Sequence, residues 1–224
     1  MENKFSVGKT GIIFIGGKTI KEYKLKTIKP IFSEKVSELI LEYYSTLVSS
    51  NIPVPELIEH KDLTFVSTHY GKNIIELAGE NIEEFYEHNK PLFDEILGII
   101  KKAKENNLFL DPHIKNFTIF NTKTYYVDIF PPYSMEYLEI LLKSNPSQKE
   151  KIMENHNIFS PERLSIHFLA DFMVAFNNEK VMRSLAEKMI EMNIIDHLDM
   201  SKVMEIMEID RLRKSPLNDK YDLL

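Results

Sequence analysis

The sequence has no cysteine, and only seven of its 224 residues are glycine. Without cysteine the chain can form neither a disulfide nor a thiolate metal site, and it has no cysteine nucleophile. No stretch approaches the roughly 18 apolar residues that a membrane span needs. The apolar run Ile12–Ile15 near the N-terminus is too short for the core of a signal peptide. We therefore expect a cytoplasmic protein without a membrane span.

The overall composition is that of a globular chain. Hydrophobic residues make up 43% of the sequence and charged residues 28%. The formal net charge is −6, which gives no electrostatic reason to expect a nucleic-acid partner. The length suffices for one large domain or two small ones.

The N-terminal third has the pattern of an antiparallel sheet that carries one helix. Three short strand-like runs separated by glycines precede Pro30, and two more follow the helix. The helix is expected from Ser33, as its N-cap, to about Val48, because apolar residues recur at helical spacing. The expected strands are Lys4–Val7, Ile12–Ile15, Thr19–Leu25, Glu56–Glu59 and Leu63–His69.

After Gly71 the sequence changes to mostly helical patterns, interrupted by a β-rich hairpin region over Leu108–Ile129. The sequence therefore predicts an α+β fold with two lobes. Residues 1–70 would form a β-rich lobe and residues 71–224 a helical lobe, with the segment 108–132 near their junction. A ligand site is expected in the cleft between the lobes.

Polar residues cluster in this junction segment within otherwise apolar sequence. Asp111, His113, Lys115 and Asn116 interrupt the run from Leu108 to Phe120, and Asp128 ends the following strand-like run. A buried carboxylate is costly unless a cation or hydrogen-bond donors satisfy it. Carboxylate and amide oxygens are the ligands that Mg²⁺ prefers, so the pattern favours a divalent metal site. Taken alone, Asp111 and Asn116 are equally consistent with turn capping.

The pattern Asp111-x-His113-x-x-Asn116, followed by Asp128 twelve residues later, resembles the catalytic loop and metal-binding aspartate of a known family. This is the aminoglycoside-phosphotransferase-like branch of the protein kinase-like fold. Upstream, residues 19–23 are similar to the family's third strand, and residues 63–71 to its fifth strand and hinge. The resemblance covers roughly residues 5–135. It implies a two-lobed fold with an antiparallel-sheet N-lobe, one main helix and a mostly helical C-lobe.

The resemblance also implies an activity: transfer of the γ-phosphoryl group of ATP, with Mg²⁺, to a hydroxyl of a small molecule or a protein. Asp111 would be the catalytic base, and Asn116 and Asp128 would hold the metal. Lys21 would contact the phosphates, and His113 would support the loop. The other residues implied for nucleotide binding are Glu38 as the partner of Lys21 (with Glu42 as the alternative), Gly8, Gly11, His69 and Tyr70.

Some positions depart from the family pattern. Gly8 and Gly11 are all that remains of the glycine-rich loop, and the glycine after the metal-binding aspartate is missing, because Ile129, Phe130 and two prolines follow Asp128 instead. These departures leave a second function open, that of an inactive pseudokinase that binds a nucleotide or a partner. The sequence does not identify the acceptor, for which Asp171, Glu179 and Asp196 are undifferentiated candidates. The seven histidines include no i, i+4 pair on a helix, which argues against a zinc site of that kind.

Overall fold

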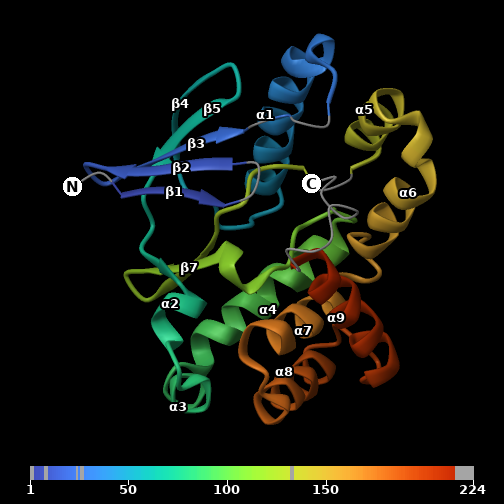
Figure 1. Ribbon diagram of the computed structural model, residues 1–224. Helices are drawn as coiled ribbons and strands as arrows, with labels where there is room; N and C mark the ends of the chain where they lie inside the picture. Colours follow the sequence, from blue (N-terminus) through green and yellow to red (C-terminus); the bar gives the residue numbers. More distant parts are fainter. Residues whose placement is uncertain (1–2, 8–9, 24, 26–27, 132–133, 215–224) are drawn as a thin grey trace.

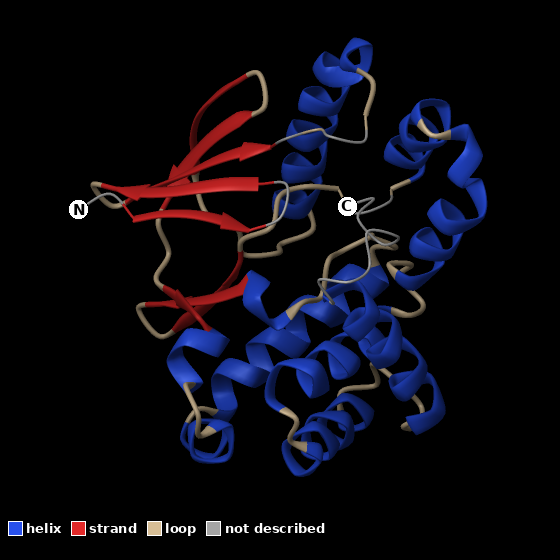
Figure 2. Cartoon of the chain, viewed as in Figure 1, coloured by secondary structure: helices blue, strands red, loops and turns tan. Residues whose placement is uncertain are grey.

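The computed structural model describes residues 3–7, 10–23, 25, 28–131 and 134–214. Strands gather on one side of the molecule and helices form the rest (Figures 1 and 2). The larger sheet has five antiparallel strands in the order β1-β2-β3-β5-β4. The strands are β1 (Asn3–Val7), β2 (Thr10–Ile15), β3 (Lys18–Tyr23), β4 (Leu57–Lys61) and β5 (Thr64–Thr68). The predicted antiparallel sheet is therefore present, and β3 lies at its centre.

Helix α1 (Ser33–Ser49) packs against this sheet and buries the apolar face that the sequence spacing indicates. Its start differs from the prediction. The chain first forms a short 3-10 turn, η1 (Pro30–Phe32), and the backbone N–H of Ser33 donates to the carbonyl of Pro30. Ser33 is therefore the first residue of the helix, and Phe32 precedes it as an N-cap without a side-chain hydrogen bond. Pro30 explains the shift, because its fixed φ suits the first position of a helical turn.

A second, smaller sheet with the order β6-β7-β8 lies at the junction of the lobes. Its strands are β6 (Lys72–Asn73), β7 (Phe117–Phe120) and β8 (Lys123–Tyr126). Gly71 leads into β6 with a φ of +68°, and a Cβ there would collide with the carbonyl oxygen of Ile119 on β7. The hinge therefore requires glycine at this position. The predicted hairpin is shorter than Leu108–Ile129, since residues 108–113 form an irregular loop followed by the 3-10 turn η2 (Ile114–Asn116).

The remaining chain is mostly helical. The helices are α2 (Ile74–Ala78), α3 (Ile82–His88), α4 (Lys90–Glu105), α5 (Met135–Ser144), α6 (Lys149–Ile158), α7 (Leu164–Phe176), α8 (Glu179–Glu191) and α9 (Met200–Lys214). The helices α4, α7, α8 and α9 form one block in Figure 1, while α5 and α6 stand beside α1. None of the helices in the described part of the chain is long and apolar enough to cross a bilayer.

Two apolar cores hold the lobes together. One lies among α4, α7, α8 and α9 and includes Leu47 from the end of α1. The other joins Phe65 of the sheet and Val36 of α1 to Leu138 of α5 and Ile152 of α6. The boundary expected at residue 70 therefore does not separate two independent cores, because α5 and α6 pack with the sheet lobe. The described chain has a lobe built on an antiparallel sheet and a mostly helical lobe, so the predicted α+β class with two lobes is confirmed.

Candidate functional site

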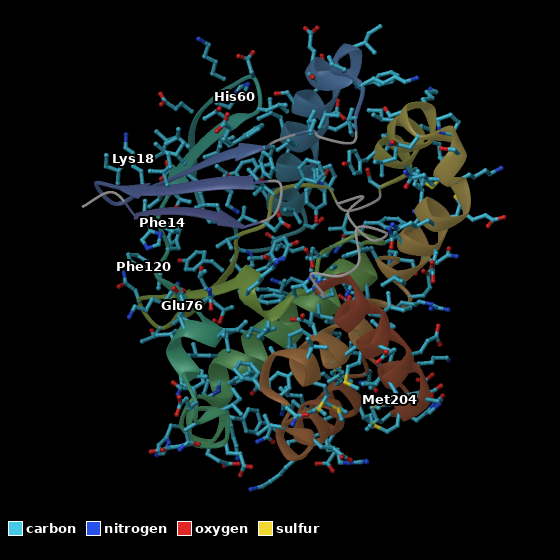
Figure 3. The ribbon with its side chains drawn as sticks, viewed as in Figure 1. Phe14, Lys18, His60, Glu76, Phe120 and Met204 are labelled. Carbon is cyan, nitrogen blue, oxygen red and sulfur yellow. The ribbon has the colours of Figure 1, made fainter. Side chains whose placement is uncertain are left out.

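A pocket of about 540 Å³ lies between the five-stranded sheet and the loop that precedes β7. Phe14 of β2 and Glu76 of α2 line it from the two lobes, and Figure 3 shows them on facing sides of the opening. Residues from the hinge between β5 and β6 form its inner edge. The sequence-predicted residues that line the pocket are Lys21, His69, Tyr70, Asp111, Asn116 and Asp128.

Buried side chains hold the loop 108–116 in place from below. The backbone N–H of Asp111 donates to the hydroxyl of Tyr126 at 3.1 Å, and the Tyr43 hydroxyl donates to the carbonyl of Phe109 at 2.8 Å. The backbone N–H of Ile114 donates to Oδ2 of Asp171, a buried residue of α7, at 2.7 Å. A hydrogen bond to a charged acceptor is among the stronger ones in proteins. The loop is therefore fixed at both ends before any ligand binds.

The β7–β8 hairpin brings Asp128 beside Asn116. Phe117 pairs with Tyr126 across the hairpin, and the backbone N–H of Val127 donates to the carbonyl of Asn116 at 2.8 Å. The side-chain Nδ2 of Asn116 donates to the carbonyl of Asp111 at 3.2 Å, and Asn116 is among the residues that line the pocket. Two oxygen-bearing side chains, separated by twelve residues in sequence, are thus placed together.

Lys21 reaches the same place from β3. Its Nζ donates to the carbonyl of Val127 at 2.5 Å. Burial lowers the pKa of Lys21, although the Asp128 carboxylate opposes this shift and Lys115 adds to it. Burial likewise raises the pKa of Asp128. The positive charge of Lys21 offsets part of this increase, and the negative charge of Asp111 adds to it. The protein alone therefore does not fully stabilise the negative charge of Asp128. A bound cation would stabilise this charge, so Asp128 is a suitable metal ligand.

Asp111 forms a close pair with His113. Both the backbone N–H and the ring Nδ1 of His113 contact Oδ1 of Asp111. Burial opposes ionisation of Asp111, but His113 and then Lys115 hold the pKa of Asp111 well below its usual value. Burial would lower the pKa of His113, and the carboxylates of Asp111 and Asp171 instead raise it to about 9. His113 does not line the pocket and lies beside Asp111 as a support.

The hinge residues His69 and Tyr70 are anchored by their neighbours. The backbone N–H of His69 donates to the carbonyl of Gly17, and its ring Nδ1 lies 3.1 Å from the hydroxyl of Thr19. The His69 ring also packs edge-on against Phe14 at 4.8 Å between centroids. The Tyr70 ring stacks on Tyr125 at 4.3 Å. Hydrogen bonds and a ring contact thus hold His69, and ring stacking holds Tyr70.

The structure does not bring every predicted residue to this pocket. Glu38 is exposed on α1 and pairs with Lys35 at 3.2 Å, and Glu42 lies 3.9 Å from the same lysine. Both carboxylates are thus directed to solvent, while Lys21 uses a backbone carbonyl instead. Gly11 pairs with Ser6 and Glu22 inside the sheet, and Gly8 lies outside the described residues.

Two supporting residues were not singled out for this site from the sequence. Asp171 was a candidate for an acceptor pocket, but it is buried in α7 and holds the loop backbone instead. The signal was present, because Asp171 is the one acidic residue in the apolar run 164–176. Tyr126, which is fully buried and supports Asp111, gave no comparable signal.

No family model and no curated protein matches this sequence. Among solved structures, the chain is similar to a choline/ethanolamine kinase family protein from Mesorhizobium loti. The identity is 11%, the TM-score is 0.36, and the match covers 96% of this chain and 89% of that one. It is also similar to the streptomycin–ATP–APH(2'')-IIa ternary complex, with 10% identity, a TM-score of 0.35, and coverage of 85% and 91%. By its own architecture, the chain has an α+β fold with a sheet lobe and a helical lobe.

Proposed function

We propose that this protein is a phosphotransferase that moves the γ-phosphoryl group of ATP, held with Mg²⁺, to a hydroxyl of a small-molecule or protein acceptor. One observation carries the proposal: a lysine, two aspartates and an asparagine from both lobes line a single pocket. They are Lys21, Asp111, Asn116 and Asp128. Phosphoryl transfer depends mainly on positioning and charge stabilisation, which these side chains are placed to supply.

The residues present fit a magnesium ion. Asn116 and Asp128 offer one amide oxygen and one carboxylate, the small number of protein ligands that Mg²⁺ takes when phosphates and waters complete its shell. The raised pKa of Asp128, caused first by burial, means that a nearby cation would stabilise its ionised form. When bound, the ion would neutralise charge on the nucleotide phosphates. Lys21 and the exposed Lys115 would add positive charge at the same place.

Asp111 would orient the acceptor hydroxyl. Its Oδ1 is engaged by His113, so Oδ2 is the atom that would receive the hydroxyl proton. A carboxylate with a pKa well below its usual value is a weak base, which suits a late proton transfer in a loose transition state. In this role His113 is a positioning residue, because it fixes the direction of the carboxylate.

One observation favours the alternative, a pseudokinase that binds a nucleotide without transfer. Glu38 pairs with Lys35 instead of Lys21, so among the described residues Lys21 has no ion pair with a glutamate of the kind that an active kinase uses to position its lysine. Both functions require nucleotide binding, and only the transferase releases ADP. A coupled assay of ADP release over a panel of hydroxyl acceptors separates them, and the Asp111→Asn variant should lose any release that depends on an acceptor.

A thermal-shift titration tests the binding step that the two functions share. At a hundredfold excess over Kd, ATP with Mg²⁺ should stabilise the protein by about 2.7 kcal/mol, or roughly 5–10 °C for a chain of this size. Asp128→Asn should abolish the dependence on Mg²⁺. The matched control is Asp94→Asn, an exposed acid of α4, which should leave the shift unchanged. Absence of a shift under every condition would overturn the transferase and the nucleotide-binding pseudokinase, and would leave only a pseudokinase that binds a partner.

A further inference from the structure

A second cluster of ionisable side chains lies behind the loop, and it adjoins the pocket through the contact of His113 with the pocket-lining Asp111. His113 from the loop, His167 from α7 and Asp210 from α9 offer three ligand atoms, all within 4.8 Å of one another. We propose that this cluster is a binding site for one divalent ion of the zinc type. The site shares no ligand with Asn116 and Asp128, so the proposal does not rest on the proposed function.

The burial of His167 gives the first reason. Its side chain has no exposed surface, and neither ring nitrogen has a hydrogen-bond partner among the described residues. A buried polar group without a partner carries a free-energy cost. His167 Nε2 instead faces the Asp210 carboxylate, with Oδ2 at 3.4 Å. An ion between these two atoms would give the imidazole the partner that it lacks.

The separations between the ligand atoms give the second reason. Zinc bound to nitrogen and oxygen at about 2.0–2.2 Å places tetrahedral ligands roughly 3.4 Å apart. The distance from His167 Nε2 to Asp210 Oδ2 is 3.4 Å, and that from His113 Nε2 to the same oxygen is 4.0 Å. Small side-chain rotations would therefore close the site around an ion. Imidazole with carboxylate is a donor set that zinc accepts.

The surroundings of His113 give the third reason. Its Nδ1 contacts the Asp111 carboxylate, which directs Nε2 toward the cluster. Histidines that bind metal commonly donate their second ring N–H to a carboxylate in this way. Asp171 Oδ1 lies 3.7 Å from His113 Nε2 and adds negative charge. Three buried or half-buried carboxylates thus surround two imidazoles, an arrangement that a divalent cation would neutralise.

The ligands come from three segments up to 97 residues apart (210 − 113), which explains why no helical His pair marked the site in the sequence. An ion here would connect α9 to the loop that carries Asp111. We therefore expect it to stabilise the packing of α9 on α7 and to leave the magnesium ligands untouched.

The test uses the full chain, which is stripped of metal with EDTA, loaded with Zn²⁺ and dialysed. Inductively coupled plasma mass spectrometry then measures the zinc content. We expect one Zn²⁺ per chain, and Co²⁺ as a substitute should give the visible absorption of a four-coordinate site. His167→Gln and Asp210→Asn should each lose the ion, and the exposed control His197→Gln should retain it.

A measurement on the unmutated chain keeps the proposal testable even if the variants fail to fold. Zn²⁺ should raise the melting temperature of the stripped protein, while Mg²⁺ without nucleotide should not. Substoichiometric Zn²⁺, a six-coordinate Co²⁺ spectrum, or folded variants that keep the ion would overturn the proposal.

Discussion

The hydrogen bond between Ile114 and Asp171 gives the sharpest prediction for the fold of the site. Asp171→Ala removes the acceptor of the Ile114 N–H, a bond of 2.7 Å at a position without solvent exposure. Loss of a hydrogen bond to a charged group costs about 1.5–3 kcal/mol, and a buried N–H left without a partner lies at the upper end. We therefore expect a loss of about 2–3 kcal/mol in the free energy of unfolding, or roughly 4–12 °C in melting temperature.

Urea unfolding followed by circular dichroism, in EDTA, measures this loss without a contribution from metal. Asp171→Asn keeps an acceptor oxygen and should lose less than half as much. Asp94→Ala, an exposed acid, should stay within about 0.5 kcal/mol of the unmutated chain. A loss below about 0.5 kcal/mol for Asp171→Ala would refute the view that this carboxylate fixes the loop.

Three further predictions concern the hinge and the charges of the site. Gly71→Ala should lower the melting temperature much more than Gly79→Ala. Both glycines have a positive φ, but only at Gly71 would the added Cβ collide with the Ile119 carbonyl. Equal losses in melting temperature would contradict this. In metal-free protein, His113, with its pKa raised to about 9, should contribute stability that is full below about pH 6.5 and lost as the pH rises through 9. The loss is roughly 3 kcal/mol at most, and urea midpoints should show it in the unmutated chain and not in His113→Asn. The Asp128→Asn variant should melt at a temperature no lower than that of the unmutated chain at pH 7. Burial raises the pKa of Asp128, so the ionised carboxylate of Asp128 opposes folding, and the substitution removes that charge. A clearly lower melting temperature of the variant would count against this.

The sequence was sufficient for the parts of the site that depend on local spacing. Asn116 precedes and Asp128 follows an antiparallel hairpin of two four-residue strands joined by a tight turn. The pairing of these strands brings the two ends of the hairpin together. Lys21 faces the pocket because residues alternate along a strand, and its same-face neighbours Thr19 and Tyr23 line the pocket too.

The parts that depend on how elements pack could not be read from the sequence. The direction of Glu38 follows from the rotation of α1 about its axis, which is set by apolar contacts with the sheet and with α5. Asp171 was visible as a charge in an apolar helix, but its partner Ile114 lies 57 residues away. Ser33 was misplaced by one position because the 3-10 turn at Pro30 depends on the loop before it.

The central claim is that the pocket binds a nucleotide with a divalent ion between Asn116 and Asp128. A crystal structure with a non-hydrolysable ATP analogue and Mn²⁺ tests it most directly, because Mn²⁺ is located by its anomalous scattering. The account predicts a Mn²⁺ peak in contact with the Asn116 amide oxygen and the Asp128 carboxylate, with the phosphates beside Lys21. A nucleotide bound elsewhere, or a Mn²⁺ peak that touches neither residue, would contradict it.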